Sequence, residues 1–161
     1  MRLYVVRHGK AEDVGPDGTD SSRRLTEEGR REFRRAADGL ASLGIRLDHL
    51  FTSPLPRAKE TAEILAESLG GPDPELASGL GPGASERAIL ELVAGTGDEV
   101  AIVGHEPTLG QLVSLAVFGR PSGGTPLRKG GAACLEFERG PAPGRGVLGW
   151  LLTPKQLRRL G

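Results

Sequence analysis

The chain has 161 residues, a length typical of one domain, and its 25 glycines and 12 prolines predict a folded protein with many loops. Its 21 basic residues balance its 21 acidic residues, so the protein as a whole is not expected to bind nucleic acid or a membrane surface. A single cysteine, Cys134, excludes an internal disulfide framework and a cysteine-based metal cluster. No apolar segment is long enough to cross a membrane and no signal-peptide pattern is present, which predicts a cytoplasmic protein with one domain over residues 1–161.

The first half of the chain alternates between strand and helix patterns. A short apolar run ends at Arg7-His8 and Gly9, as is typical of a strand buried on both faces of a parallel sheet. Thr26 is a candidate N-cap, and Gly44 a candidate C-cap, of the helix between them. In order, we predict a strand at 3–6, a polar loop at 10–24, a helix at 27–43, a strand at 49–52 and a helix at 56–69.

The second half continues this alternation and then changes to a hairpin. In order, we predict a loop-like tract to residue 84, a short helix from Ser85 to about Gly95, a strand at 100–103, a helix from Pro107 to Gly119, a loop at 120–131, two strands at 132–137 and 146–152, and a terminal helix from Pro154. Strands alternating with helices predict a mostly parallel sheet covered by helices on both faces. The fold class is therefore a three-layer α/β/α arrangement with an antiparallel edge.

Two of the three histidines lie directly after predicted buried strands. His8 follows the first strand and His105 the strand at 100–103. Because ligands of open parallel sheets bind beyond the carboxyl ends of the strands, both imidazoles are expected at one edge of the sheet. Arg7 and Arg57 belong to the same edge, since Arg57 opens the helix after the second strand. The glycine after His8, Gly9, removes a side chain where a ligand would approach the backbone.

This set of groups predicts a site for a phosphoryl group. Two guanidiniums and two imidazoles would repel one another unless an anion joined them, and guanidinium forks match phosphoryl oxygens in bidentate geometry. One neutral imidazole can then attack phosphorus in line, since an unperturbed histidine has a pKa of about 6.5. The second histidine would be charged and stabilise the oxyanions of the transition state. This chemistry needs no metal and no cofactor.

Structural interpretations remain open for each of these residues. A single histidine at the end of a strand is more often structural than catalytic, although two of them after parallel strands favour a site. Arg57 at a helix start is by default a solvated side chain. Arg7 could instead form an ion pair with Glu12 or Asp13.

Other chemically notable residues are predicted to be structural. His49 begins a strand and has no partner pattern, and Cys134 alternates with apolar neighbours. Four arginines share the helix at 27–43 and are predicted to form a solvated face that could attract an acidic partner: Arg30, Arg31, Arg34 and Arg35.

Four short motifs follow one another along the chain. They are Val-Arg-His-Gly at 6–9, Leu-Thr-Glu-Glu-Gly at 25–29, Ser-Pro-Leu-Pro-Arg-Ala-Lys-Glu-Thr-Ala at 53–62 and Val-Gly-His at 103–105. In order and spacing they resemble the Arg-His-Gly, Leu-Thr-x-x-Gly, Ser-x-x-x-Arg-Ala-x-x-Thr-Ala and Gly-His elements of the histidine phosphatase superfamily. That superfamily also contains the cofactor-dependent phosphoglycerate mutases, so the resemblance implies a phosphoglycerate mutase-like fold.

Carried over by position, the resemblance implies that His8 is a nucleophile that forms a phosphohistidine intermediate. It also implies that the phosphoryl group is bound by Arg7, Arg57 and His105. This agrees with the site deduced from the residues alone.

Within the superfamily the chain resembles the SixA-type phosphohistidine phosphatases. It shares their small size, a segment at 70–98 with almost no inserted lid, and the ending at 150–154. Those enzymes remove phosphate from a histidine on a signalling protein. The implied function is therefore phosphohistidine phosphatase, and the implied partner is a phosphorylated histidine-carrier protein.

One departure from the superfamily bears on the substrate. Mutases and many sugar-phosphate phosphatases carry a carboxylic general acid before the third helix, whereas residues 80–84 contain none. The imidazole that departs from phosphohistidine can be neutral, so the missing acid should matter less. Glu86 and Glu106 remain alternative proton donors, and Glu106 could instead orient a ring or lie at the surface. The rival functions are a phosphatase of small phosphorylated substrates that uses the same His8 and a catalytically silent phosphate-binding module.

Overall fold

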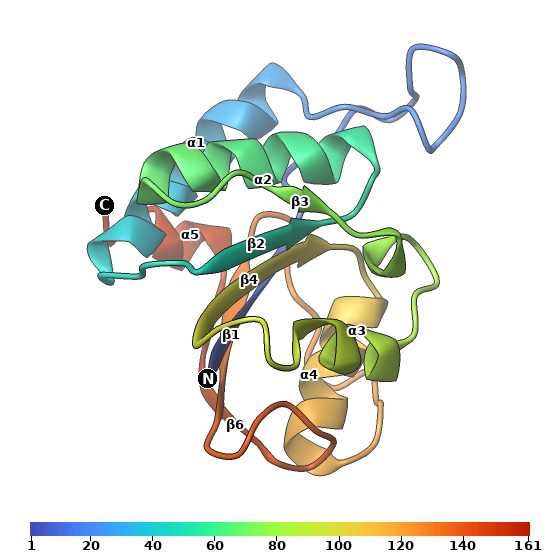
Figure 1. Cartoon of the computed structure of the whole chain (residues 1–161). Helices are drawn as coiled ribbons and strands as arrows, with labels where there is room; N and C mark the ends of the chain where they lie inside the picture. The colour runs from blue at the N-terminus through green and yellow to red at the C-terminus, as the bar shows by residue number, and fades with distance from the viewer.

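The fold is built around one six-stranded sheet, and the computed structural model describes the whole chain, residues 1–161 (Figure 1). In chain order the strands are β1 (Arg2–Arg7), β2 (His49–Thr52), β3 (Glu75–Leu76), β4 (Glu99–Gly104), β5 (Ala132–Phe137) and β6 (Gly146–Leu152). Their order across the sheet is β3-β2-β4-β1-β5-β6. The central strands β1 and β4 are the continuous apolar runs of the sequence, and both are buried.

The pairing of the strands brings the chain to one edge of the sheet after β1, β2 and β4. These strands are parallel, with Arg7 opposite Gly104 and Thr52 opposite Val103. The residues that follow them therefore emerge side by side. On the other side of β1 the hairpin β5–β6 is antiparallel, which confirms the mostly parallel sheet with an antiparallel edge.

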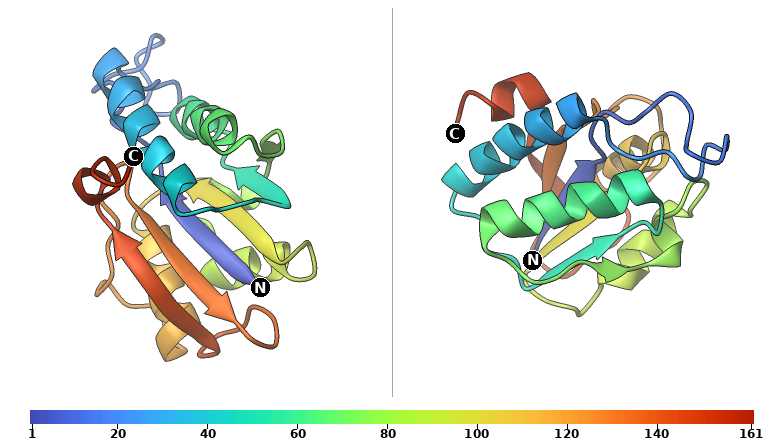
Figure 2. Two further views of the ribbon diagram at one scale, coloured as in Figure 1. Left: turned by 90° about the vertical axis from the view of Figure 1, so that its left-hand side faces the viewer. Right: turned by 90° about the horizontal axis from the view of Figure 1, so that it is seen from above.

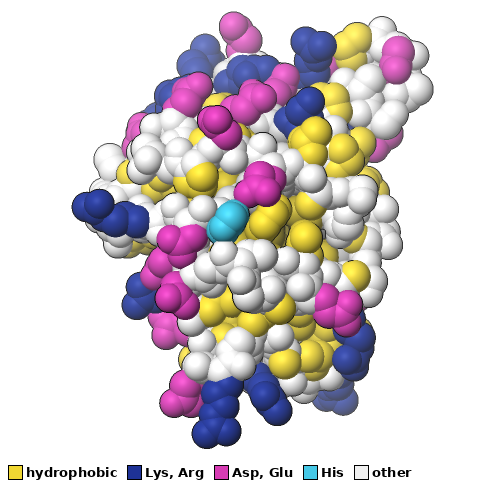
Figure 3. All heavy atoms as spheres, viewed as in Figure 1, with side chains coloured by type: hydrophobic (Ala, Val, Ile, Leu, Met, Phe, Trp, Pro, Cys, Tyr) yellow, Lys and Arg dark blue, Asp and Glu magenta, His cyan; other side chains and the backbone are white.

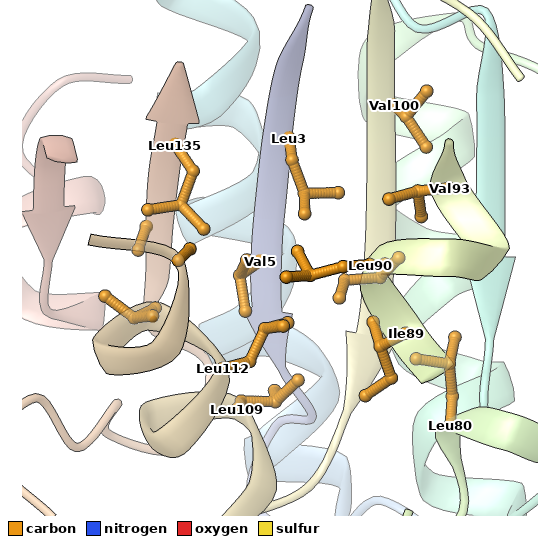
Figure 4. Close-up of a cluster of buried hydrophobic side chains, with 14 of the residues drawn as sticks. Leu3, Val5, Leu80, Ile89, Leu90, Val93, Val100, Leu109, Leu112 and Leu135 are labelled. Carbon is orange, nitrogen blue, oxygen red and sulfur yellow. The ribbon is translucent and has the colours of Figure 1, made fainter. Parts of the chain in front are cut away.

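Helices cover both faces of the sheet, which confirms the three-layer α/β/α class (Figure 2). Helices α1 (Glu27–Ser42), α2 (Pro56–Leu69) and α5 (Pro154–Leu157) pack on one face, and α3 (Glu86–Val93) and α4 (Thr108–Phe118) on the other. Alternate residues of β1 face opposite layers: Leu3 and Val5 pack against α3 and α4, as Figure 4 shows, and Tyr4 and Val6 face α1 and α2. None of the helices combines the length and apolar character needed to cross a membrane.

The caps of α1 and α3 follow from the sequence. Thr26 accepts a hydrogen bond from the Gly29 amide, and Ser85 accepts one from Ala88, as expected of N-cap residues. Helix α1 ends at Ser42 and its C-cap is Leu43, so the predicted C-cap Gly44 lies one residue further on, where it has a positive φ of +74°.

Two further parts of the sequence prediction need correction. The tract to residue 84 is not entirely loop, because it contains β3 and a 3-10 helix at Ser78–Leu80. Strand β3 has only two residues, both exposed, so it carries no periodic apolar pattern. Helix α4 begins at Thr108, and Pro107 is its N-cap rather than its first residue.

Candidate active site

His8 and His105 emerge from neighbouring parallel strands, and their rings lie beside each other. The ring centroids are 5.1 Å apart, and both side chains are buried. The backbone continues the sheet at this point, because the His8 amide donates to the carbonyl of Gly104. The structure thus brings together the two imidazoles that the sequence placed at one edge.

Two arginines lie next to these rings. Arg57, in the first turn of α2, is 5% exposed although it is charged. Arg7 ends β1, and its Nη1 donates to the carbonyl oxygen of Leu127 at 2.8 Å. Both guanidiniums lie close enough to lower the pKa of His8 and of His105. The structure therefore collects four of the predicted residues in one place, and Arg7 forms no ion pair with Glu12 or Asp13.

The His8 ring is held in one tautomer. Its Nδ1 lies 2.8 Å from the carbonyl oxygen of Gly9. A carbonyl only accepts, so Nδ1 carries the proton and Nε2 keeps a free lone pair. Burial, aided by the neighbouring cations, lowers the pKa of His8 to about 3. At neutral pH His8 is thus an uncharged imidazole with an available nucleophilic nitrogen.

His105 is also neutral in the anion-free protein. Burial and the nearby Arg57 lower its pKa to about 4. Its Nε2 lies 2.7 Å from the hydroxyl of Ser53, whereas its Nδ1 is buried without a partner. His105 therefore carries the positive charge predicted for the second histidine only when an anion is bound in the site.

Three buried nitrogens of these residues have no hydrogen-bond partner. They are the Nε of Arg7, the Nε of Arg57 and the Nδ1 of His105, which come from three different parts of the chain. A buried donor without an acceptor costs about 1–3 kcal/mol. A phosphoryl group offers several acceptor oxygens and the negative charge that two arginines require. The chemistry of the site is that of an oxyanion site.

Asp20 is a further member of the site that sequence reasoning missed. Its backbone oxygen and its carboxylate accept hydrogen bonds from Arg57 at 2.8 and 3.1 Å. The same carboxylate accepts from Arg23 at 2.7 Å. These two arginines, Arg23 first, lower the pKa of Asp20. Asp20 lies in the polar loop at 10–24, where no periodicity or strand end marks one residue above its neighbours.

The contacts of Gly9 differ from the predicted phosphate contact. Its amide donates to Thr61 Oγ1 at 3.1 Å, so this N–H is already used. A side chain at Gly9 would meet Leu25 at 3.3 Å and Phe33 at 3.4 Å. A side chain at this position would be crowded by these two residues, and the role of Gly9 in binding phosphate stays a prediction.

Thr61 links the turn after His8 to the helix that carries Arg57. Its hydroxyl accepts from Gly9 and donates to the carbonyl of Arg57 at 2.6 Å. It is fully buried. Sequence reasoning gave Thr61 no role, although it stands in the motif at 53–62.

Glu106 is partly exposed and has a partner within the fold, so it is more than a solvated surface side chain. It is half-buried, and burial raises its pKa. Its Oε1 accepts a hydrogen bond from the amide of Leu127 at 3.0 Å. The carbonyl of the same residue, Leu127, accepts from Arg7. Glu106 thus fastens the loop at 120–131 in the position that orients Arg7. Glu86, the other alternative proton donor, is the first residue of α3.

The residues predicted to be structural lie apart from this site. His49 stacks on Phe51 and pairs with Glu75 at 2.9 Å, and Cys134 is buried in β5. The arginines of α1 are exposed; two of them form ion pairs across to α2, Arg30 with Glu60 and Arg34 with Glu67. Charges of both signs are interspersed over the face drawn in Figure 3.

Comparison with known proteins agrees with this site. The profile of the histidine phosphatase superfamily (branch 1) matches residues 3–81. An uncharacterised protein of Picosynechococcus sp. is 37% identical over 135 residues, which are 81% of this chain and 82% of that protein. The chain belongs to the histidine phosphatase superfamily.

Two solved structures of SixA phosphatases are similar to the chain over nearly its whole length. The structure of the protein histidine phosphatase SixA complexed with tungstate matches with a TM-score of 0.81 and 25% identity, over 98% of this chain and 99% of that one. A putative phosphohistidine phosphatase SixA from Agrobacterium tumefaciens matches with a TM-score of 0.78 and 25% identity, over 95% and 97%. The phosphoglycerate mutase-like fold is thereby confirmed, and the chain is a member of a superfamily of phosphatases.

Proposed function

We propose that residues 1–161 form one histidine phosphatase domain that removes the phosphoryl group from a phosphorylated histidine of a carrier protein. The observation that carries this proposal is the neutral His8 with a free Nε2, its ring 5.1 Å from His105 and beside two arginines. The similarity to SixA, whose structure holds the tetrahedral oxyanion tungstate, supports the same use of this site.

In the first step His8 accepts the phosphoryl group. Its Nε2 lone pair forms a bond to phosphorus while the P–N bond of the substrate breaks, and the electron pair of that bond goes to the departing imidazole. When the other ring nitrogen of the substrate carries a proton, this imidazole leaves neutral. Arg7 and Arg57 bind the phosphoryl oxygens throughout, because guanidinium N–H groups stabilise the charge that they carry.

In the second step water releases the phosphoryl group. Phosphorylated His8 is itself a phosphohistidine, so the same leaving-group chemistry applies. The oxygen of water bonds to phosphorus, the N–P bond breaks, and its electron pair returns to Nε2. The protons of the water end on the phosphate product and in solvent. Because Nδ1 keeps its proton, which it donates in a hydrogen bond to the Gly9 carbonyl, His8 leaves as a neutral imidazole and the enzyme is restored.

The carboxyl groups near the site favour a phosphoramidate over a phosphate ester. An ester needs an acid to protonate its departing alkoxide. Residues 80–84 contain no carboxyl group. The arginines lower the pKa of Asp20, so it is ionised at neutral pH. Glu106, whose pKa burial raises, uses Oε1 to accept the Leu127 amide and remains an alternative proton donor. A neutral imidazole leaves without such an acid.

Substrate preference tests the proposal. We would compare kcat/KM for a carrier protein phosphorylated on histidine with kcat/KM for a panel of sugar and glycerate phosphates. Since a general acid contributes about a hundredfold or more to ester cleavage, we expect at least that preference for phosphohistidine. Preference for the panel would favour the phosphatase of small substrates. Turnover of neither class would favour the phosphate-binding module.

A further inference from the structure

Ser53 contacts Nε2 of His105, the ring nitrogen other than the unpartnered Nδ1. It follows β2, is fully buried, and its amide donates to the carbonyl of Val103 in β4. Its Oγ is 2.7 Å from Nε2 of His105. The backbone hydrogen bond fixes the residue after β2 to β4, and the Ser53 hydroxyl contacts the ring of His105, the residue after β4.

The direction of this hydrogen bond follows from the partners of Ser53. A serine hydroxyl has one proton to donate and two lone pairs to accept with. One lone pair already accepts the amide of Leu55 at 3.3 Å. His105 Nε2 is the one remaining group within hydrogen-bond distance of this oxygen. If Nε2 carried the proton, the buried hydroxyl proton would have no acceptor, so donation from Ser53 to Nε2 satisfies the Ser53 hydroxyl and this one nitrogen of His105.

We propose that Ser53 is a positioning residue that keeps the neutral His105 ring protonated on Nδ1, so that this nitrogen donates a hydrogen bond to a bound phosphoryl oxygen. The inference rests on the proposed function, because it assigns the anion of that reaction to the site. With the opposite tautomer, Nδ1 would present a lone pair to the oxygens of the anion and repel them. Ser53 thus selects the ring state that binds.

The charged groups around His105 make this choice of tautomer consequential. Arg57 from α2 and Arg7 from β1 face the ring and oppose its protonation, while Asp20 from the loop at 10–24 favours it. The ring of His8, 5.1 Å away, is neutral, so it supplies no negative charge that would stabilise a protonated His105. The His105 ring is therefore neutral before the anion arrives. When the anion allows His105 to take up a proton, the serine hydroxyl must rotate and accept from Nε2, which leaves its own proton without an acceptor, so the contact favours the neutral ring.

A spectrum of the wild-type protein tests the tautomer directly. In the full chain, ¹⁵N-labelled and without anion at pH 7, two-bond ¹⁵N–¹H correlations of the His105 ring distinguish a protonated nitrogen from an unprotonated one. We expect a protonated Nδ1 and an unprotonated Nε2. A proton on Nε2 in the wild type would overturn the proposal without any need for a variant.

Binding of inorganic phosphate tests the consequence. Ser53→Ala should shift His105 toward the tautomer with the proton on Nε2 and weaken phosphate binding about tenfold, since a buried donor is replaced by a lone pair. Ser68→Ala is the matched control, because Ser68 has a buried hydroxyl without a partner near the other end of α2. It should leave the Kd for phosphate within about twofold. Equal binding by the two variants would contradict the role of Ser53.

These measurements need no turnover, so they are separable from the proposed function. A protein with the expected tautomer and phosphate binding but no phosphohistidine hydrolysis would refute the function and retain the role of Ser53. A protein that hydrolyses phosphohistidine with His105 protonated on Nε2 would do the reverse.

Discussion

Arg57 and Asp20 form an ion pair between a buried guanidinium and an exposed carboxylate. Arg57 Nη2 lies 3.1 Å from Oδ2 of Asp20, and the two side chains are 6% and 66% exposed. The Nε of Arg57 has no partner, whereas its Nη1 and Nη2 both donate hydrogen bonds to Asp20. A phosphoryl group that binds Arg57 must therefore compete with a carboxylate of the protein itself.

Asp20→Asn should strengthen the binding of inorganic phosphate. The substitution removes the negative charge that competes for Arg57, and because this carboxylate is solvent-exposed the effect is small, about two- to fivefold in Kd. Isothermal titration calorimetry measures it. Asp13→Asn is the control, since it changes the net charge equally from an exposed position in the same loop. Equal effects of both variants would mean that the change in net charge, not the loss of the Arg57 partner, strengthens binding. Weaker binding by Asp20→Asn would mean that Asp20 helps to hold the anion.

Arg57→Ala should reduce kcat/KM by about a hundred- to a thousandfold. The change removes a charged donor from a buried site, where the proposed mechanism has it stabilise the phosphoryl oxygens. Steady-state kinetics with the phosphohistidine carrier measure the loss. Arg34→Ala removes an arginine that pairs with Glu67 on the exposed side of α1 and should leave activity unchanged. Activity of Arg57→Ala within threefold of wild type would place Arg57 outside the reaction.

Thr61→Val should lower the free energy of unfolding by about 1–3 kcal/mol. Valine has nearly the shape of threonine, but it leaves the buried amide of Gly9 without an acceptor. Urea denaturation measures the change. Thr61→Ser keeps the hydroxyl and should retain most of the stability; if both variants lose the same amount, the missing contact is packing by the methyl group rather than the hydrogen bond.

Stability should fall in acid because the two active-site histidines are buried in the neutral form. Their pKa values, about 3 for His8 and about 4 for His105, lie below the value near 6.5 expected in the unfolded chain. Between these values the unfolded state binds more protons, so stability is complete above about pH 6.5 and is lost as pH falls toward 4, by up to about 1.4 kcal/mol per pH unit for each histidine.

Urea denaturation at pH 7 and pH 4.5 checks this dependence. Carboxylates titrate in the same range, so His8→Gln is compared with the wild type. The variant should lose less stability on acidification, since one buried imidazole is absent. His49→Gln is the control, because His49 lies partly exposed beside Glu75. An equal loss in wild type and His8→Gln would contradict a buried neutral His8.

The parts of the fold and the site that could be predicted depend on strong local patterns. The apolar runs of β1 and β4 identify buried strands, and the rule that ligands bind beyond parallel strand ends places His8 and His105 together. Asp20 could not be found this way, because its position depends on how a non-periodic loop folds onto α2. Strand β3 has two residues, too few for a pattern.

Ser53 is an intermediate case. It stands in a motif that the sequence displays, yet the chain alone does not show which atom its hydroxyl meets. That contact depends on the register of β2 against β4, which sets Thr52 opposite Val103 and so brings Ser53 close to His105. Tertiary pairing, not local propensity, defines its partner.

The most direct test of the account is the covalent state of His8 during turnover. The protein would be mixed with a ³²P-labelled phosphohistidine carrier, quenched in alkali, and its labelled peptide identified by mass spectrometry, with His8→Ala in parallel. The account predicts an acid-labile, alkali-stable label on His8 in the wild type and none in the variant. Release of phosphate without any label on His8, or a label that persists in His8→Ala, would contradict it.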